Sequence, residues 1–165
     1  MKSLKILTLA AILALAAGTA GSAERHPYPP PGQARADLAH ALKIAAATHK
    51  RVILDFGGNW CPDCQVLNIY FHNSQNLPIL TKNFLLVDVN IGEYDANLDL
   101  AKRYDVPLKK GVPALAVLSD EGKLLYTQKQ GEFEAMSHMD PSSVTRFLLQ
   151  WRPQHPGCSM MAMNC

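Results

Sequence analysis

The sequence predicts an α/β fold built around one mixed β-sheet, and two patterns carry this prediction. Apolar runs typical of strands alternate with helical patterns as far as about residue 104, an order that favours parallel pairing of the strands. Beyond that point, the turn residues at 120–123 separate two short apolar runs, which indicates a C-terminal antiparallel hairpin. The chain has 165 residues, of which 48% are hydrophobic, and this fits one domain with a sizeable core.

The charge distribution argues against a nucleic-acid partner. The formal net charge is +2, and charged residues make up 18% of the chain. Lysine and arginine form no run and no basic helix face interleaved with aromatic residues. A nucleic-acid-binding surface needs such a concentration of positive charge, so we exclude that class of function.

The first 23 residues have the layout of a secretory signal peptide. Lys2 and Lys5 precede an apolar stretch at 6–17, and small residues follow up to Ala23. We expect cleavage after Ala23. An uncleaved anchor is the less favoured alternative, because the apolar stretch is shorter than the about 20 residues that span a bilayer. The mature protein is then periplasmic or secreted, without a stable membrane span, in a compartment where disulfides persist.

The mature chain is expected to begin with a linker, a helix and a strand. Residues 24–36 are rich in proline and predict an extended, exposed linker. From Asp37 to Thr48 apolar residues recur at helical spacing, with Asp37 as the expected N-cap. Residues 51–56 are mostly β-branched, aromatic or leucine and end at two glycines, which predicts a buried strand.

Two cysteines, Cys61 and Cys64, follow these glycines and open a helical pattern that continues to Phe71. A cysteine at the start of a helix lies near free backbone N–H groups and the positive end of the helix dipole, which favours its thiolate. The second cysteine lies one turn further on, so the pair can form a small-ring disulfide. Half of a zinc site is the alternative. Because Cys158 and Cys165 have six residues between them, no second Cys-x-x-Cys pair exists, and we favour redox chemistry.

The remaining patterns complete one domain and show no internal repeat. We expect a turn and short helix at 73–83, a strand at 84–90, a helix at 96–104, a strand at 112–118, a hairpin strand at 124–126 and a last helix at 141–151. Asp140 is the expected N-cap of the last helix. The domain then spans 37–152, and residues 153–165 form a tail rich in cysteine and methionine.

The strand that contains Asp55, followed by Trp60-Cys61-Pro62-Asp63-Cys64, resembles the active-site region of the thioredoxin superfamily. The resemblance covers about 37–152 and implies a three-layer sandwich, in which helices flank the mixed sheet. It also implies a thiol–disulfide oxidoreductase that acts on protein thiols and disulfides and needs no cofactor. We expect a monomer that works with a redox partner the sequence does not identify.

The resemblance also implies roles for residues around the cysteine pair. Pro113 matches the family's cis-proline, which faces the Cys-x-x-Cys, and Val112 would pair with the substrate through its backbone. Trp60 and Pro62 are expected to contact the substrate too, Trp60 as an apolar wall beside the sulfurs. For Pro113, the alternative is a trans proline that begins a strand.

Three acidic residues lie near the expected site. Asp55 matches the family's buried acid, so its pKa should be raised, and it can exchange a proton with Cys64 through water. Asp88 stands where the family often has a lysine. Asp63 should raise the pKa of Cys61 by opposing its thiolate, and a solvated carboxylate of little effect is the alternative.

The tail offers a second functional hypothesis. Its thiols, thioethers and the imidazole of His155 are soft ligands that suit Cu(I). They predict a copper chaperone that would use Cys61 and Cys64 together with the tail, where the candidate ligands are Cys158, Met160, Met161, Met163 and Cys165. A local disulfide between Cys158 and Cys165 is the reading we favour, because thioethers without a rigid scaffold are weak evidence for a metal site. A thioredoxin-like adaptor without turnover is a third hypothesis.

Overall fold

The computed structural model describes residues 27–154 of the chain. Helices and strands alternate along most of this part, with three short 3-10 helices between them. The main elements in chain order are α1 (Ala34–Thr48), β1 (Arg51–Gly57), α2 (Pro62–Phe71), α3 (Leu77–Asn83), β2 (Phe84–Asn90), α4 (Leu98–Arg103), β3 (Ala114–Leu118), β4 (Leu124–Thr127) and α5 (Ser142–Trp151).

The four strands form one mixed sheet in the order β2-β1-β3-β4. β1 runs parallel to β2, with Arg51 opposite Phe84 and Gly57 opposite Asn90. β3 runs antiparallel to β1 on its other side, and β4 pairs antiparallel with β3 as a hairpin. The predicted combination of a parallel pair with a C-terminal antiparallel hairpin is confirmed.

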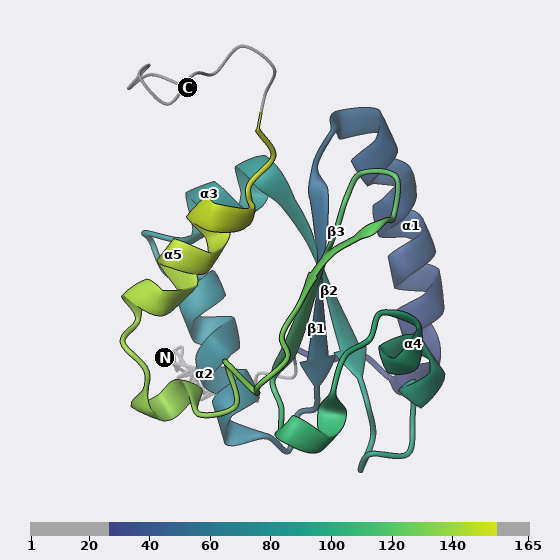
Figure 1. Cartoon of the computed structure of the whole chain (residues 1–165), viewed down its shortest axis with the longest axis vertical. Coiled ribbons are helices and arrows are strands. Elements are labelled where there is room, and N and C mark those ends of the chain that lie inside the picture. The colour runs from purple at the N-terminus through teal and green to yellow at the C-terminus, as the bar shows by residue number, and fades with distance from the viewer. Residues whose placement is uncertain (1–26, 155–165) are drawn as a thin grey trace, which may run out of the picture.

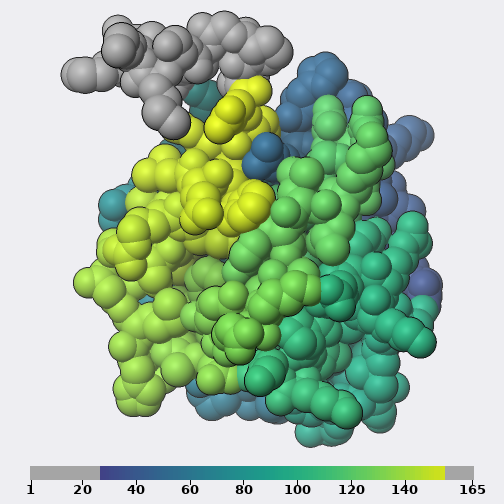
Figure 2. Space-filling view, in the orientation of Figure 1, coloured from purple at the N-terminus to yellow at the C-terminus, as the bar shows by residue number. Residues whose placement is uncertain are grey.

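Helices cover both faces of the sheet, so the predicted three-layer sandwich is confirmed (Figure 1). α1 and α4 lie on one face, where alternate residues of β1 such as Leu54 and Phe56 meet Leu38 and Leu100 in one apolar cluster. α2, α3 and α5 lie on the other face, around Ile53. In the space-filling view, α5 in yellow lies directly alongside the green β3–β4 hairpin (Figure 2), where the rings of Tyr126 and Trp151 have centroids 4.9 Å apart.

The sequence predicts an exposed linker in the proline-rich segment, but part of this segment is buried. Tyr28 is only 2% exposed, and a 3-10 turn at Pro31–Gln33 leads directly into α1. The backbone N–H of Ala34 donates to the carbonyl oxygen of Pro31, so the helix begins as soon as the prolines end. The expected N-cap at Asp37 is therefore wrong by just over one turn, since Gln33 is the N-cap, because the prolines themselves fix the backbone direction that starts the helix.

Two further boundaries differ from the sequence patterns. The helix α5 begins at Ser142, and its N-cap is Pro141 rather than Asp140. Oδ1 of Asp140 still accepts a hydrogen bond from the Ser142 N–H at 2.8 Å. The carboxylate thus caps the first N–H of the helix, although Asp140 lies one residue before the N-cap. The strand β3 begins at Ala114, two residues after the predicted start at Val112, which leaves Val112 and Pro113 outside the strand and free to face the cysteines.

Candidate active site

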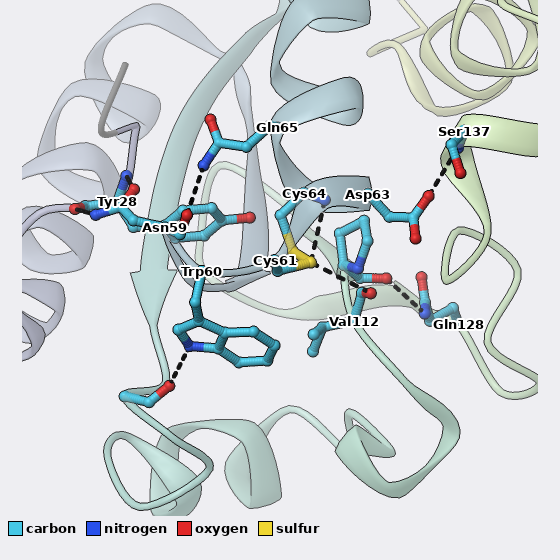
Figure 3. Close-up of a disulfide and its surroundings, with 12 residues drawn as sticks. Tyr28, Asn59, Trp60, Cys61, Asp63, Cys64, Gln65, Val112, Gln128 and Ser137 are labelled. Carbon is cyan, nitrogen blue, oxygen red and sulfur yellow. Dashed lines mark hydrogen bonds between the residues drawn. A yellow bond between two sulfur atoms is a disulfide. The ribbon is translucent and has the colours of Figure 1, made fainter. Parts of the chain in front are cut away.

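The two cysteines lie where the sheet passes into the helix α2. β1 ends at Gly57, and α2 begins at Pro62 with Cys61 as its N-cap. Cys61 and Cys64 form a disulfide, and the backbone N–H of Cys64 points at Sγ of Cys61 from 3.1 Å (Figure 3). The sequence therefore folds this motif as a helix start that directs a backbone donor onto the first sulfur.

The cysteine pair is largely covered by its surroundings. Cys61 is 3% exposed and Cys64 is fully buried. Sγ of Cys61 lies 3.6 Å from the carbonyl oxygen of Val112, and the peptide bond between Val112 and Pro113 is cis. The fold thus brings the carbonyl of Val112, two residues before β3, against the sulfur at the start of α2.

A buried glutamine that sequence reasoning missed supports this contact. Gln128, directly after β4, is fully buried. Its Nε2 donates to the carbonyl oxygen of Pro113 at 3.2 Å, and its Oε1 accepts from the N–H of Leu115 at 3.0 Å. The sequence carries no signal for this role, since a glutamine after a hairpin strand is ordinarily solvated.

Trp60 and Tyr94 form an exposed aromatic pair beside the disulfide. The indole Nε1 of Trp60 donates to the carbonyl oxygen of Gly92 at 2.7 Å, and the Trp60 and Tyr94 rings have centroids 5.6 Å apart. Each side chain is 43% exposed. Trp60 therefore presents an apolar surface next to Cys61, and Pro62 follows as the first residue of α2.

The carboxylate of Asp63 has a backbone partner in a distant part of the chain. Its Oδ1 accepts a hydrogen bond from the N–H of Ser137 at 2.7 Å, and Figure 3 shows the side chain directed away from the disulfide toward that residue. Ser137 belongs to the short 3-10 helix Met136–His138. The first turn of α2 is in this way tied to the segment that precedes α5.

Asp55 lies in the sheet, buried, with only 1% of its surface exposed. Burial raises the pKa of its carboxyl well above the ordinary value, and the charge of Asp88 raises it further. Asp88 is the residue opposite Asp55 on β2. Burial raises the pKa of Asp88 to about 7, and the positive charge of His72 partly opposes this.

Tyr28 is a second residue that sequence analysis missed. It lies in the predicted linker, yet its ring is buried and points toward Cys64 (Figure 3). Burial, followed by the charges of Asp55 and Asp88, raises the pKa of its hydroxyl well above 10. The one available signal was an aromatic residue between prolines, because such a side chain buries a large apolar surface when it finds a partner.

The tail residues of the copper hypothesis, Cys158, Met160, Met161, Met163 and Cys165, lie outside the described residues. Between residues 27 and 154 there is no group of three or more His, Cys, Asp or Glu side chains that could hold a metal ion. The helices within that range are all too short or too polar to cross a membrane.

Comparison with known proteins gives a consistent result for the fold. A family model described as thioredoxin-like matches residues 33–119. The crystal structure of a disulphide isomerase from Xylella fastidiosa Temecula1 is 34% identical, with a TM-score of 0.72, and the match covers 76% of this chain and 96% of that one. A thioredoxin from Thermus thermophilus is 22% identical, with a TM-score of 0.50, over 74% of this chain and 83% of that one. None of the curated protein sequences matches this chain.

Proposed function

Because the chain belongs to the thioredoxin-like family, we propose that it is an exported thiol–disulfide oxidoreductase that reduces or exchanges disulfides in protein substrates. The observation that carries the proposal is the Cys61–Cys64 disulfide at the start of α2, next to Val112. The Xylella fastidiosa protein of similar structure is described as a disulphide isomerase, which agrees with this class of chemistry.

Cys61 is the nucleophile in this proposal. In the reduced protein its sulfur lies at the N-terminus of α2, where the helix dipole and the Cys64 N–H stabilise a thiolate. The thiolate is the reactive form of a cysteine toward disulfides. Cys64, being fully buried, is left for the second step.

The reaction proceeds through a mixed disulfide. The Cys61 thiolate attacks one sulfur of the substrate disulfide, so that a Cys61–substrate bond forms and the other substrate sulfur leaves as a thiolate. Cys64 loses its proton to Asp55 and attacks Sγ of Cys61, which releases the second substrate thiolate and restores the Cys61–Cys64 disulfide. The substrate gains two electrons, and a redox partner must return two electrons to this protein.

The substrate binds across the rim of the site. The backbone of Val112 offers hydrogen-bonding groups next to Cys61 for an extended substrate segment, and Pro113 fixes that backbone. Trp60 and Pro62 supply apolar contact on the opposite side, since Trp60 is half-exposed. Gln128 donates a hydrogen bond to the carbonyl of Pro113 and so fixes the backbone position of this surface.

Insulin reduction by the mature protein, together with trapping of mixed disulfides, tests the proposal. Wild-type protein should precipitate insulin chains in the presence of a small thiol, and both Cys61→Ala and Cys64→Ala should lose turnover. Only Cys64→Ala should accumulate covalent substrate adducts, because this variant has no second active-site thiol to release the substrate from Cys61. If Cys61→Ala formed such adducts instead, or if wild-type protein did not reduce insulin, the proposal would be wrong.

The exported location is the part of the proposal that rests on residues 1–23 alone. Processing of the signal peptide should leave a mature chain that starts at Glu24 in the periplasm or the medium. The mass of the protein recovered from each fraction measures this. Full-length protein retained with the membranes would favour the uncleaved anchor.

A further inference from the structure

The hydroxyl of Tyr28 lies at the buried side of the active-site disulfide. A Cβ atom added to Gly57 would lie 2.5 Å from the Tyr28 hydroxyl oxygen and 2.7 Å from Sγ of Cys64. These two atoms therefore flank the same small space, which is open only because residue 57 is a glycine. Figure 3 shows the Tyr28 ring directed toward Cys64.

Asparagine side chains hold the Tyr28 backbone in this position. The N–H of Tyr28 donates to Oδ1 of Asn59 at 3.1 Å, and Nδ2 of Asn59 donates back to the carbonyl of Tyr28 at 2.8 Å. Asn90 donates to the carbonyl of Pro29 at 2.9 Å. Because Asn59 lies two residues before Cys61, the tyrosine is attached to the loop that carries the cysteine pair.

Two polar atoms in this buried region are incompletely paired in the oxidised protein. The hydroxyl of Tyr28 and Oδ1 of Asp55 make no hydrogen bond of standard geometry within residues 27–154. The two groups are nevertheless close, because a side-chain hydrogen bond between them raises the pKa of Tyr28 and lowers that of Asp55. Buried polar groups are nearly always fully paired, so this incomplete pair can take up a new partner. In the disulfide form Sγ of Cys64 carries no proton. Reduction converts it into a thiol, which brings a new donor and acceptor to the space beside Tyr28.

We propose that Tyr28 is a proton-relay residue, whose hydroxyl passes the proton of the Cys64 thiol to the carboxylate of Asp55. This inference rests on the proposed function and concerns its second step. The hydroxyl accepts the thiol proton while it donates its own to Asp55, so Tyr28 ends unchanged, Asp55 becomes neutral and Cys64 becomes a thiolate. The thiolate then attacks Sγ of Cys61 and expels the substrate thiolate. The reverse transfer accompanies reduction of the disulfide.

The charges around this cluster suit such a transfer. Burial and the charges of Asp55 and Asp88 raise the pKa of Tyr28, so the hydroxyl keeps its own proton at neutral pH. Burial raises the pKa of Asp55, which makes its carboxylate a better acceptor for a thiol proton. Two other charged groups affect the pKa of Asp88. The charge of His72, at the end of α2, lowers this pKa, and the charge of Asp37, in α1, raises it.

Stopped-flow reaction of the reduced mature protein with dithiobis(nitrobenzoate) separates the two steps. Attack by Cys61 releases one thionitrobenzoate, and resolution by Cys64 releases the second in a phase that Cys64→Ala should lack. Tyr28→Phe should slow the second phase at least about tenfold at pH 7, because positioned proton transfer contributes factors of that size or larger. The first phase should stay within about twofold of wild type, since Tyr28 faces Cys64.

The pH profile distinguishes a relay from a structural role. As the pH rises, hydroxide takes the Cys64 proton without the relay, so the difference between Tyr28→Phe and wild type should shrink and be small near pH 9.5. Asp55→Asn should slow the same phase, and adding Tyr28→Phe to it should slow the phase no further. Tyr126→Phe removes a tyrosine hydroxyl from the far side of the sheet and is the matched control, expected to behave as wild type.

Three results would contradict the proton relay through Tyr28, and a fourth would contradict the proposed function. The relay is wrong if Tyr28→Phe leaves the second phase unchanged at pH 7, slows it equally at all pH values, or adds its full effect to Asp55→Asn. If Tyr28→Phe does not fold by circular dichroism, the solvent deuterium isotope effect of wild type decides: a second phase slowed in D₂O at pH 7 but not at pH 9.5 supports the relay, and equal rates refute it. Wild-type protein without a first phase would refute the proposed function itself.

Discussion

Asp55 and Asp88 lie opposite each other on the parallel strands β1 and β2, so the protein has two carboxyl groups where thioredoxin-like sites often combine an acid with a lysine. Burial raises the pKa of both groups, that of Asp88 to about 7. No lysine or arginine among the described residues forms an ion pair with either of them. The pair therefore opposes folding when it becomes charged.

Replacement of Asp88 by asparagine should stabilise the oxidised protein at neutral and alkaline pH. The folded pKa of about 7 exceeds the ordinary value of 3.8. The stability that the protein has with a protonated Asp88 carboxyl is therefore fully present below about pH 4 and is lost as the pH rises through 7, where the buried carboxyl becomes charged. Asp88→Asn should thus raise the free energy of unfolding at pH 8 by about 2 to 4 kcal/mol, with little change near pH 4. Urea denaturation at several pH values measures this.

Asp105→Asn is the matched control for this experiment. The Asp105 carboxyl is exposed and paired with Lys129, and exposed ion pairs contribute little, about 0 to 1 kcal/mol. The control should follow the wild-type curve at all pH values. An Asp88→Asn protein that is less stable than wild type at pH 8 would contradict the assigned pKa direction.

Alkylation of the reduced protein should modify Cys61 before Cys64. Cys61 is the helix N-cap and retains slight exposure, whereas Cys64 is fully buried, and the thiolate at the helix start is the reactive species. Limiting iodoacetamide at neutral pH, followed by peptide mass spectrometry, identifies the modified residue. Faster labelling of Cys64 would reverse the roles that we assign to the two cysteines.

Gln128→Leu should weaken both stability and substrate binding. The change leaves the Pro113 carbonyl and the Leu115 N–H buried without their partner, and an unpaired buried group costs about 1 to 3 kcal/mol. We expect a lower free energy of unfolding and a higher KM for insulin. Gln150→Leu, on the exposed side of α5, is the control. Loss of stability with an unchanged KM would limit Gln128 to a role in folding.

Asp63 should hold the reduction potential of the disulfide below about −180 mV, towards the reducing end of the range between the strong oxidants and thioredoxin. Its negative charge lies in the first turn of α2, where it opposes the Cys61 thiolate that a strong oxidant stabilises. Asp63→His should therefore raise the potential, measured by equilibration with glutathione. Asp63→Asn keeps an acceptor for the Ser137 N–H and removes the charge, so it should give part of the rise. An unchanged potential in both variants would show that Asp63 does not set it.

Removal of residues 155–165 should leave insulin reduction nearly intact, because Cys61, Cys64 and the residues that surround them lie within 27–154. The measurement is the insulin assay on truncated and full-length protein, with copper content determined alongside. Loss of activity together with bound copper would favour the copper hypothesis. Loss of activity without copper would indicate that Cys158 or Cys165 relays electrons.

The cysteine pair, the parallel strands and the hairpin were predictable from the sequence because each depends on neighbours along the chain. Apolar runs define β1 and β2, Gly122 marks the hairpin turn with a positive φ of 80°, and Cys61 with Cys64 fits one turn of helix. Periodicity and turn chemistry act over a few residues, and a sequence reports them directly.

Only the tertiary structure decided which distant groups complete the site. Tyr28 meets Asn59 across 31 positions, Gln128 meets Pro113 across 15, and Asp63 meets Ser137 across 74. The sequence predicts a linker for the proline-rich segment because its composition excludes a helix. Composition does not show that the side chains of Asn59, in the loop after β1, and Asn90, at the end of β2, will bind its carbonyl groups. Such contacts form only after the sheet has brought their donors together, so the sequence determines the reactive pair and the fold determines its environment.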